Sequence, residues 1–126
     1  MKIQITAGKI SVNATLSDTP TARAIWDALP IEGIGQLWGE EIYFSIPVDV
    51  EGESDARAEV DVGDLGYWPP GHAFCIFFGR TPASTGDRPV AASPVNVMGQ
   101  IDGDANAFAS VPDGETVRLE ALDENV

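Results

Sequence analysis

The sequence predicts a mainly β protein, an antiparallel barrel of seven or eight short strands with one short helix near the N-terminus. Apolar and polar residues alternate with a period of two in several short segments, a pattern typical of strands with one buried face. Only residues 18–30 change to helical spacing. Many short strands joined by glycine and proline turns favour closure into a barrel, because closure leaves few strand edges exposed.

Chain length and cysteine content indicate one cytoplasmic domain. The 126 residues allow one substantial core, whereas two cores would each be too small, so we expect a single domain over residues 1–126. The only cysteine, Cys75, lies in the apolar run 73–78, which excludes a disulfide framework and is typical of a reducing cytoplasm. No signal peptide is recognisable, and no apolar run approaches the roughly 18–20 residues of a membrane span.

The chain is strongly acidic, with 20 acidic against 7 basic residues and a formal net charge of -13. Such a field disfavours nucleic acid and anionic membranes as partners, because binding them requires clustered lysine and arginine. The acids gather in residues 49–64 and 102–124, where they serve solubility or, alternatively, a cation site. No loop has the spacing of a calcium site and no metal-ligand spacing surrounds the single histidine, so no metal or cofactor is expected.

The first 30 residues predict a hairpin followed by the helix. Apolar residues alternate with polar ones in segments 2–6 and 10–16, on either side of Gly8, which predicts a β-hairpin with one buried face. Asp18 and Thr19 supply N-cap candidates, and Pro20 falls in the first helical turn, where its missing N–H costs nothing. The helical spacing continues until Pro30, which ends the helix.

The rest of the chain predicts further strands and turns. We expect strands over 42–48, 58–62, 65–68, 73–78, 95–101 and 117–121, a Pro-Pro-Gly turn at 69–71, a loop over 79–89, and a short helical turn within 104–111. The run 73–78 has no polar alternation, so it is expected to be a central strand covered on both faces. In the strand 95–101, Val95, Val97 and Ile101 are assigned to the core face, and Asn96 and Met98 to the other face.

Glu41 and Tyr43 form the sharpest candidate pair for a functional site. They occupy the polar face of a strand whose other face carries Ile42 and Phe44, so they sit on a rigid element and reach solvent. There we expect Glu41 to act as a base or carboxylate anchor and Tyr43 as a hydrogen-bond donor. Alternatively, Glu41 is a solvated strand residue and Tyr43 only packs under the helix or a loop.

Other candidates are aromatic or polar residues near the turns. Tyrosine and tryptophan suit partly exposed binding surfaces, because a large apolar body carries one polar atom. The grouped aromatics are Trp38, Tyr43, Tyr67, Trp68, Phe77 and Phe78. The residues expected to line a ligand site are Trp38, Tyr67, His72, Phe77 and Asn96. His72 is alternatively an exposed turn residue after Pro-Pro-Gly.

Arg80 is the third catalytic candidate, as the partner of an anionic group. It shares the loop 79–89 with Arg88, and two of the seven bases in one loop could hold a carboxylate or another anion. Alternatively, the two arginines neutralise the acidic surface.

Four runs of the sequence are distinctive: Trp-Gly-Glu-Glu-Ile-Tyr-Phe at 38–44, Gly-Asp-Leu-Gly-Tyr-Trp-Pro-Pro-Gly at 63–71, Phe-Phe-Gly-Arg-Thr-Pro at 77–82 and Ser-Pro-Val-Asn-Val-Met-Gly at 93–99. In these runs the chain resembles the small stand-alone cyclophilin-like proteins of bacteria and archaea. That family is largely of unknown function, and the resemblance covers nearly the whole chain. It implies a closed eight-stranded β-barrel with a helix covering one opening. True cyclophilins are peptidyl-prolyl isomerases that hold a proline peptide on the outer face of the barrel beside an arginine, whereas the corresponding stretch here, 40–44, carries acids.

Three functions are compatible with these patterns. The first is a cyclophilin-like protein that binds a small molecule or peptide in a cleft on the outer face of the barrel. The second is a weak or atypical peptidyl-prolyl cis-trans isomerase that uses Arg80 or Arg88. The third is a non-catalytic protein-interaction domain whose contact surface is the acidic segment 49–64. The sequence does not indicate an oligomeric state.

Overall fold

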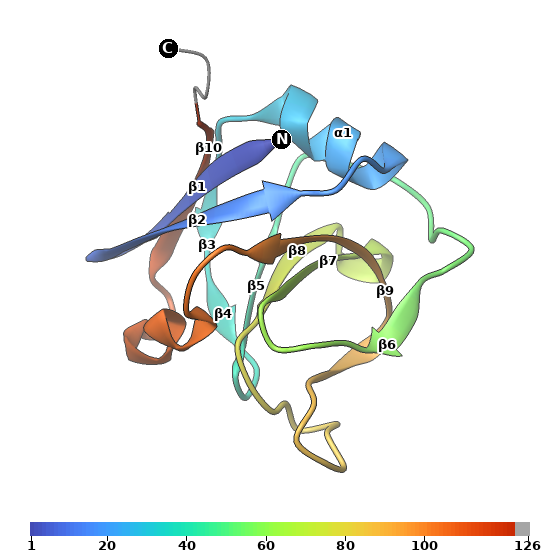
Figure 1. The fold of residues 1–126 in the computed structure, drawn as a ribbon, viewed down its shortest axis with the longest axis vertical. Helices are drawn as coiled ribbons and strands as arrows, with labels where there is room; N and C mark the ends of the chain where they lie inside the picture. The colour runs from blue at the N-terminus through green and yellow to red at the C-terminus, as the bar shows by residue number, and fades with distance from the viewer. Residues whose placement is uncertain (123–126) are drawn as a thin grey trace.

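The regular structure of the described residues consists mainly of antiparallel strands, with one α-helix and two 3-10 helices (Figure 1). The computed structural model describes residues 1–122, so the predicted end of the domain at 126 lies outside the described residues. The elements are β1 (Lys2–Ala7), β2 (Ile10–Leu16), α1 (Pro20–Ala28), β3 (Ile31–Ile34), β4 (Gln36–Leu37), β5 (Glu41–Ser45), β6 (Arg57–Glu59), β7 (Asp64–Trp68), η1 (Pro69–Gly71), β8 (Ala73–Phe77), β9 (Val90–Ile101), η2 (Ala105–Ser110) and β10 (Thr116–Ala121).

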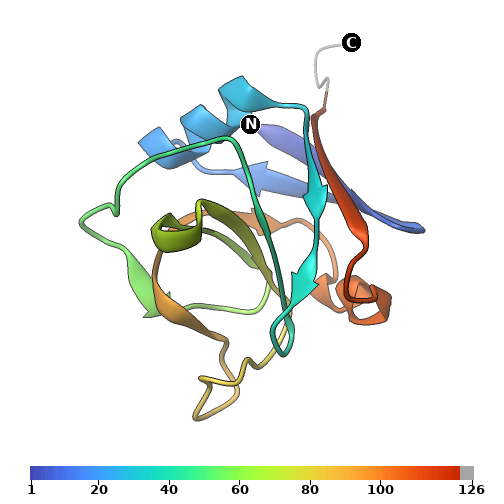
Figure 2. The same cartoon turned by 180° about the vertical axis from the view of Figure 1, so that it is seen from behind.

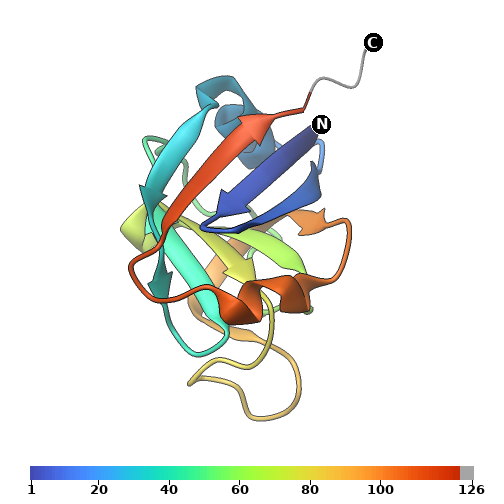
Figure 3. The same ribbon diagram turned by 90° about the vertical axis from the view of Figure 1, so that its left-hand side faces the viewer.

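The prediction of a closed eight-stranded barrel is wrong. The sheet has ten strands, and its hydrogen-bonded order, β3-β10-β1-β2-β9-β7-β8-β5-β4, does not return to its first strand, while β6 pairs with β9 off this path. The sheet is strongly curved, and Figure 3 shows β10, β1 and β2 side by side along one wall. The mainly β class with a single α-helix is correct.

The two ends of this order, β3 and β4, are consecutive in the chain and are separated only by Gly35. Before Gly35, β3 pairs with β10, and after it β4 pairs with β5. Gly35 itself donates its N–H to Glu115 O at 2.8 Å and accepts from Gly114 N at 2.8 Å. The sequence predicted neither short strand, because Glu32 and two glycines interrupt the alternation of apolar residues over this segment.

The hairpin and the helix form as their patterns predict. β1 pairs with β2 around Gly8, whose φ of 61° suits the tight turn. Thr19 is the N-cap of α1, and its hydroxyl accepts from Ala22 N at 3.1 Å. The helix buries Ala22 and Ile25 against the sheet. In Figures 1 and 2 it covers one end of the curved sheet, while the loop 79–89 projects from the opposite end.

The central strand β8 is buried on both faces, as the unbroken apolar run predicts. It lies between β7 and β5, and all five of its residues are buried. Phe74 and Ile76 point into the main core, whereas Ala73, Cys75 and Phe77 belong to a second apolar cluster. The sheet therefore carries hydrophobic packing on its outer face as well as its inner face.

The long strand β9 bends and pairs with three neighbours, β2, β7 and β6. A bulge at Met98, opposite Leu65 and Gly66 of β7, shifts its register. The predicted faces of this strand are therefore largely exchanged: Met98 lies in the main core, and Val95 and Val97 lie in the second cluster. Side chains alternate between the two faces of a strand only until a bulge inserts an extra residue. A uniform alternation over 95–101 therefore predicts the wrong faces for these residues.

Substitution of Gly99 by alanine should destabilise the fold, because the added Cβ would lie 2.4 Å from Thr15 O and 3.1 Å from Leu16 Cα in β2. The expected loss in the free energy of unfolding is about 1–3 kcal/mol, as for other overpacked sites, measured by urea denaturation. Gly103→Ala is the control, since a Cβ there meets nothing within 4 Å. Equal stabilities of the two variants would contradict this close approach of β2 and β9.

Candidate functional site

A second hydrophobic cluster covers the outer face of strands β8, β7 and β9. We call it the outer cluster; its buried members are Val60, Ala73, Cys75, Phe77, Ala91 and Val95, and Tyr43, Trp68 and Val97 pack against it. It forms because successive residues of a strand point to opposite faces, and β8 is apolar at every position. The outer cluster provides a rigid floor on a face that would otherwise be solvated.

A cavity of about 200 Å³ opens beside the outer cluster. We call it the outer cavity; its lining residues are Trp38, Glu41, Tyr43, Trp68 and Ala92. Glu41 and Tyr43 project from the same face of β5 and are paired in register with Phe77 and Cys75 of β8. Three aromatic side chains and one carboxylate thus surround a small space on a strand-built floor, which is the usual composition of a ligand site.

The polar atoms of two wall residues are already engaged by protein partners. The Tyr43 hydroxyl donates to Gln36 Oε1 at 2.8 Å, and Trp68 Nε1 donates to Ser93 Oγ at 2.7 Å. These bonds fix the orientation of both rings. Glu41 supplies the only carboxyl group among the residues that line the cavity.

Glu41 is buried and incompletely hydrogen-bonded. Only 5% of the residue is exposed, and its Oε1 is the one buried side-chain oxygen or nitrogen within residues 1–122 that has no partner. Burial raises the pKa of Glu41 from 4.5 to about 7, and the nearby thiol of Cys75 offsets only part of this rise. The expected solvated position of Glu41 is therefore incorrect: the side chain lines a cavity rather than an open surface.

A carboxyl group in this setting has two chemical capabilities. As the carboxylate it accepts a hydrogen bond or pairs with a cation, and as the neutral acid it donates a proton. A pKa near neutrality allows both forms at physiological pH, as a general acid or base requires. The Cys75 thiol behind it is no nucleophile, because burial holds the pKa of this thiol well above its usual value.

Two of the predicted lining residues lie away from the outer cavity, in the interior. Tyr67 is fully buried in the main core, where its hydroxyl donates to Val48 O at 2.6 Å and accepts from Val50 N at 3.3 Å. Asn96 is also fully buried, and its Nδ2 donates to Glu51 O at 2.9 Å. Their polar atoms serve to hold the segment 48–53 against the sheet rather than to meet a ligand.

Three other candidates, Phe77, Arg80 and His72, also do not line the outer cavity. Phe77 is buried in the outer cluster and packs beneath the cavity without lining it. Arg80 is exposed and does not line the cavity, and its carbonyl oxygen accepts from Glu40 N at 2.7 Å. His72 is exposed at the end of η1, with its Nε2 3.2 Å from Asp49 Oδ1. The structure thus brings together Trp38, Glu41 and Tyr43, but not the other five.

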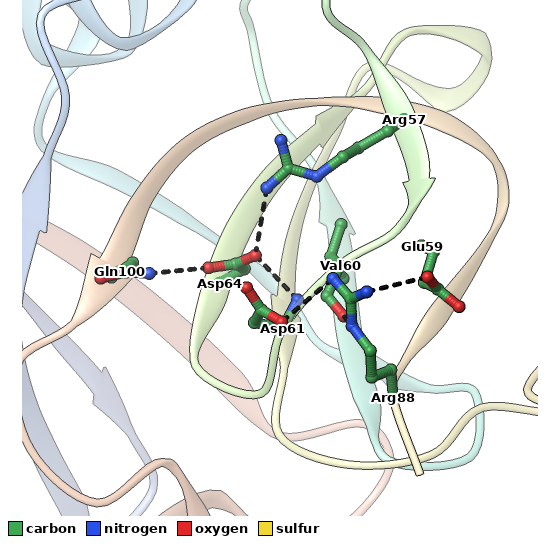
Figure 4. A network of polar contacts seen from close by, with 7 residues as sticks. All are labelled: Arg57, Glu59, Val60, Asp61, Asp64, Arg88 and Gln100. Atoms are coloured by element: carbon green, nitrogen blue, oxygen red, sulfur yellow. Dashed lines mark hydrogen bonds and ion pairs between the residues drawn. The ribbon is translucent and has the colours of Figure 1, made fainter. Parts of the chain in front are cut away.

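Arg88 is committed to the acidic surface (Figure 4). Its guanidinium lies 2.8 Å from Glu59 Oε1 and 3.0 Å from Asp61 Oδ1. In the same network Arg57 lies 3.8 Å from the buried carboxylate of Asp64. Of the two alternatives for Arg88, the structure favours neutralisation of neighbouring acids over the binding of an external anion.

Trp68 and Ala92 line the cavity, although the sequence patterns did not predict them as lining residues. Trp68 was noted only among the grouped aromatics, although a signal was present: Leu65 and Tyr67 alternate with Gly66 and Trp68, which puts Trp68 on the outer face. Ala92 had no signal, because an alanine in a loop-like segment carries no chemistry of its own. Its place in the wall follows from the bend of β9 alone.

Within residues 1–122, no group of three or more histidine, cysteine, aspartate or glutamate residues is placed to hold a metal ion. No helix in the described part of the chain is long and apolar enough to cross a membrane.

Fold and site together define a small antiparallel β protein whose candidate site lies on the outer face of its sheet. The family described as Cyclophilin-like matches residues 1–120. No curated protein matches the chain. The solution structure of the hypothetical protein AF2241 from Archaeoglobus fulgidus is similar to it, with 41% identity, a TM-score of 0.80, and coverage of 97% of this chain and 95% of that chain. The chain belongs to the cyclophilin-like family, as the four sequence runs indicated.

Glu41→Gln should stabilise the protein above neutral pH but not in acid. Because folding raises the pKa of Glu41 from 4.5 to about 7, the unfolded chain loses this proton first as the pH rises, and the free energy of unfolding falls across that interval. The variant avoids this loss, which amounts to at most about 3 kcal/mol at ~1.4 kcal/mol per pKa unit.

The measurement is urea denaturation of both proteins at pH 4.5 and pH 8, the lower value being the ordinary pKa of the group. Asp87→Asn is the matched control, since Asp87 is exposed in the loop 79–89. A stability difference between wild type and Glu41→Gln that stays the same at both pH values would contradict the burial of an ionisable Glu41.

Proposed function

We propose that the protein binds a small molecule or a short peptide segment in the outer cavity. One observation carries the proposal: the buried Oε1 of Glu41 has no partner within residues 1–122, and its side chain lines an aromatic-walled space. A buried polar atom left without a hydrogen bond costs about 1–3 kcal/mol. A ligand that enters the cavity and donates to the carboxyl group of Glu41 would recover part of that energy.

The perturbed pKa of Glu41 supports the same location. Groups with strongly shifted pKa values in a cleft mark functional sites more often than other surface positions, and burial is the main cause of the shift here. In the proposed site Glu41 anchors the ligand through a hydrogen bond and can exchange a proton with it. Tyr43, whose own hydrogen is given to Gln36, contributes its ring and an accepting oxygen.

The cavity volume limits the size of the ligand. A space of about 200 Å³ is smaller than the roughly 300–1,000 Å³ of sites for drug-sized molecules. A compact molecule or a single peptide side chain is therefore the better match. The archaeal relative is described as a hypothetical protein and suggests no particular ligand.

The two alternative functions have less support. A prolyl isomerase would need a donor beside the twisted amide, yet no arginine of the described chain lines the outer cavity, and Arg88 is held by Glu59 and Asp61. An interaction surface on the segment 49–64 would need its acids free. Asp64 is buried there, and Glu53 accepts a hydrogen bond from the hydroxyl of Thr21.

Ligand binding should appear in NMR spectra as shifts of the Trp38 and Trp68 indole N–H signals. Trp26 lies on α1 and packs against the main core, so its indole signal is an internal reference. We expect a mixture of small amines, amides, acids and alanine-proline peptides to contain compounds that shift the two cavity signals selectively. Glu41→Gln should weaken this binding about tenfold or more, which corresponds to the loss of a charge-assisted hydrogen bond.

Asp87→Asn, which removes one carboxylate outside the cavity, should leave the binding unchanged. Equal shifts of all three indoles would indicate unspecific contact, and no shift of the cavity indoles with any class of compound would refute the proposed site. Exchange between cis and trans forms of the proline peptides, recorded on the same samples, reports directly on the isomerase alternative.

A further inference from the structure

The outer cavity has a one-sided chemistry. Its wall offers aromatic rings and one carboxyl group, while the donors of Tyr43 and Trp68 are turned to Gln36 and Ser93. An aromatic ring attracts cations to its face, which carries negative electrostatic potential. The carboxylate of Glu41 also attracts cations, so the rings and the carboxylate can act together on a positively charged ligand.

No positive group of the protein already occupies this position. Of the described basic side chains, none lines the outer cavity, and several are paired elsewhere, including Lys2 with Asp102, Arg57 with Asp64, and Arg88 with Glu59. The formal net charge of -13 further raises the local concentration of cations around the molecule. A neutral or anionic ligand would gain nothing from the attraction of the aromatic rings and the carboxylate for positive charge.

We propose that the outer cavity selects a small alkylammonium ion, an inference that rests on the binding function proposed above. An N–H of the ammonium donates to the carboxylate of Glu41, and the carbon atoms of the ligand lie against the aromatic walls. Such a hydrogen bond between two charged groups is roughly twice as strong as a neutral one. Cation–π contact in a desolvated site raises affinity further, by about tenfold or more.

This selectivity depends on pH through Glu41. Because burial holds the pKa of Glu41 at about 7, an ammonium ion meets the required carboxylate only above neutrality, and its binding should lower that pKa. The groups that face Glu41 are the Cys75 thiol from β8 and the Tyr43 ring from its own strand, and the neighbouring Glu40 carboxylate accepts a hydrogen bond from Arg80 N. The thiol stays neutral because its pKa is raised well above the usual value, so it does not compete for the charge.

The test uses three probes of similar shape and different charge: isopentylammonium, isopentanol and isovalerate. Their dissociation constants are measured by NMR titration of the Trp38 and Trp68 indoles, with Trp26 as the reference, at pH 8 and pH 5.5. We expect isopentylammonium to bind at least about tenfold more tightly than isopentanol at pH 8. Its affinity should fall at least about threefold at pH 5.5, where Glu41 is protonated and the amine remains charged.

Glu41→Gln should reduce the preference for the cation to within about twofold and remove its pH dependence, whereas Asp87→Asn should retain both. If the variant folds poorly, the pH dependence of isopentylammonium binding to the wild-type protein still tests the proposal. Isopentanol binding as tightly as isopentylammonium would overturn the cation preference and leave the binding site intact. Isovalerate binding most tightly in acid would overturn it in favour of a carboxylic acid paired with neutral Glu41. If none of the probes and no compound of the mixture above shifts the cavity indoles, the binding function fails together with this inference.

Discussion

The burial of β8 on both faces is the constraint on which the rest of the molecule depends. All five residues of this strand are buried. Its inner side chains pack in the main core, whereas its outer side chains must be covered by other residues. Val60, which directly follows β6, and residues of β5, β7 and β9 provide that cover as the outer cluster. The outer cavity lies where this cover is incomplete, between the rings of Trp38, Tyr43 and Trp68. Core packing and the candidate site are therefore consequences of the same apolar strand.

Glu41 shows how a local cost in stability and a candidate function coincide. A carboxyl group at the edge of an apolar cluster loses solvation, and its unpartnered oxygen weakens the fold above neutral pH. A glutamine or an apolar residue at this position would relieve that cost. Functional sites commonly break such local rules while the surrounding structure compensates, and here the rigid pairing of β5 with β8 holds the carboxyl group in place.

Local patterns predicted the elements well where one physical rule was sufficient. The N-cap at Thr19, the apolar run of β8 and the helical turn η2 all depend on neighbouring residues, so they could be predicted from the sequence. The strands β3 and β4 and the face of Asn96 could not be predicted. Gly35 and the bulge opposite Gly66 change pairing and register through contacts with residues far away in the chain. For the site, Glu41 and Tyr43 were predictable from alternation, whereas Ala92 was not.

The sequence by itself determined the mainly β class, the family, the helix and its cap, and the common face of Glu41 and Tyr43, because these follow from short-range periodicity and from runs of residues. Only the tertiary structure decided that the sheet stays open, that Tyr67 is turned into the core, and that Glu41 is buried. The physical reason is that closure, burial and pKa depend on which distant strands meet. That meeting is set by the packing of the whole sheet and not by any single segment.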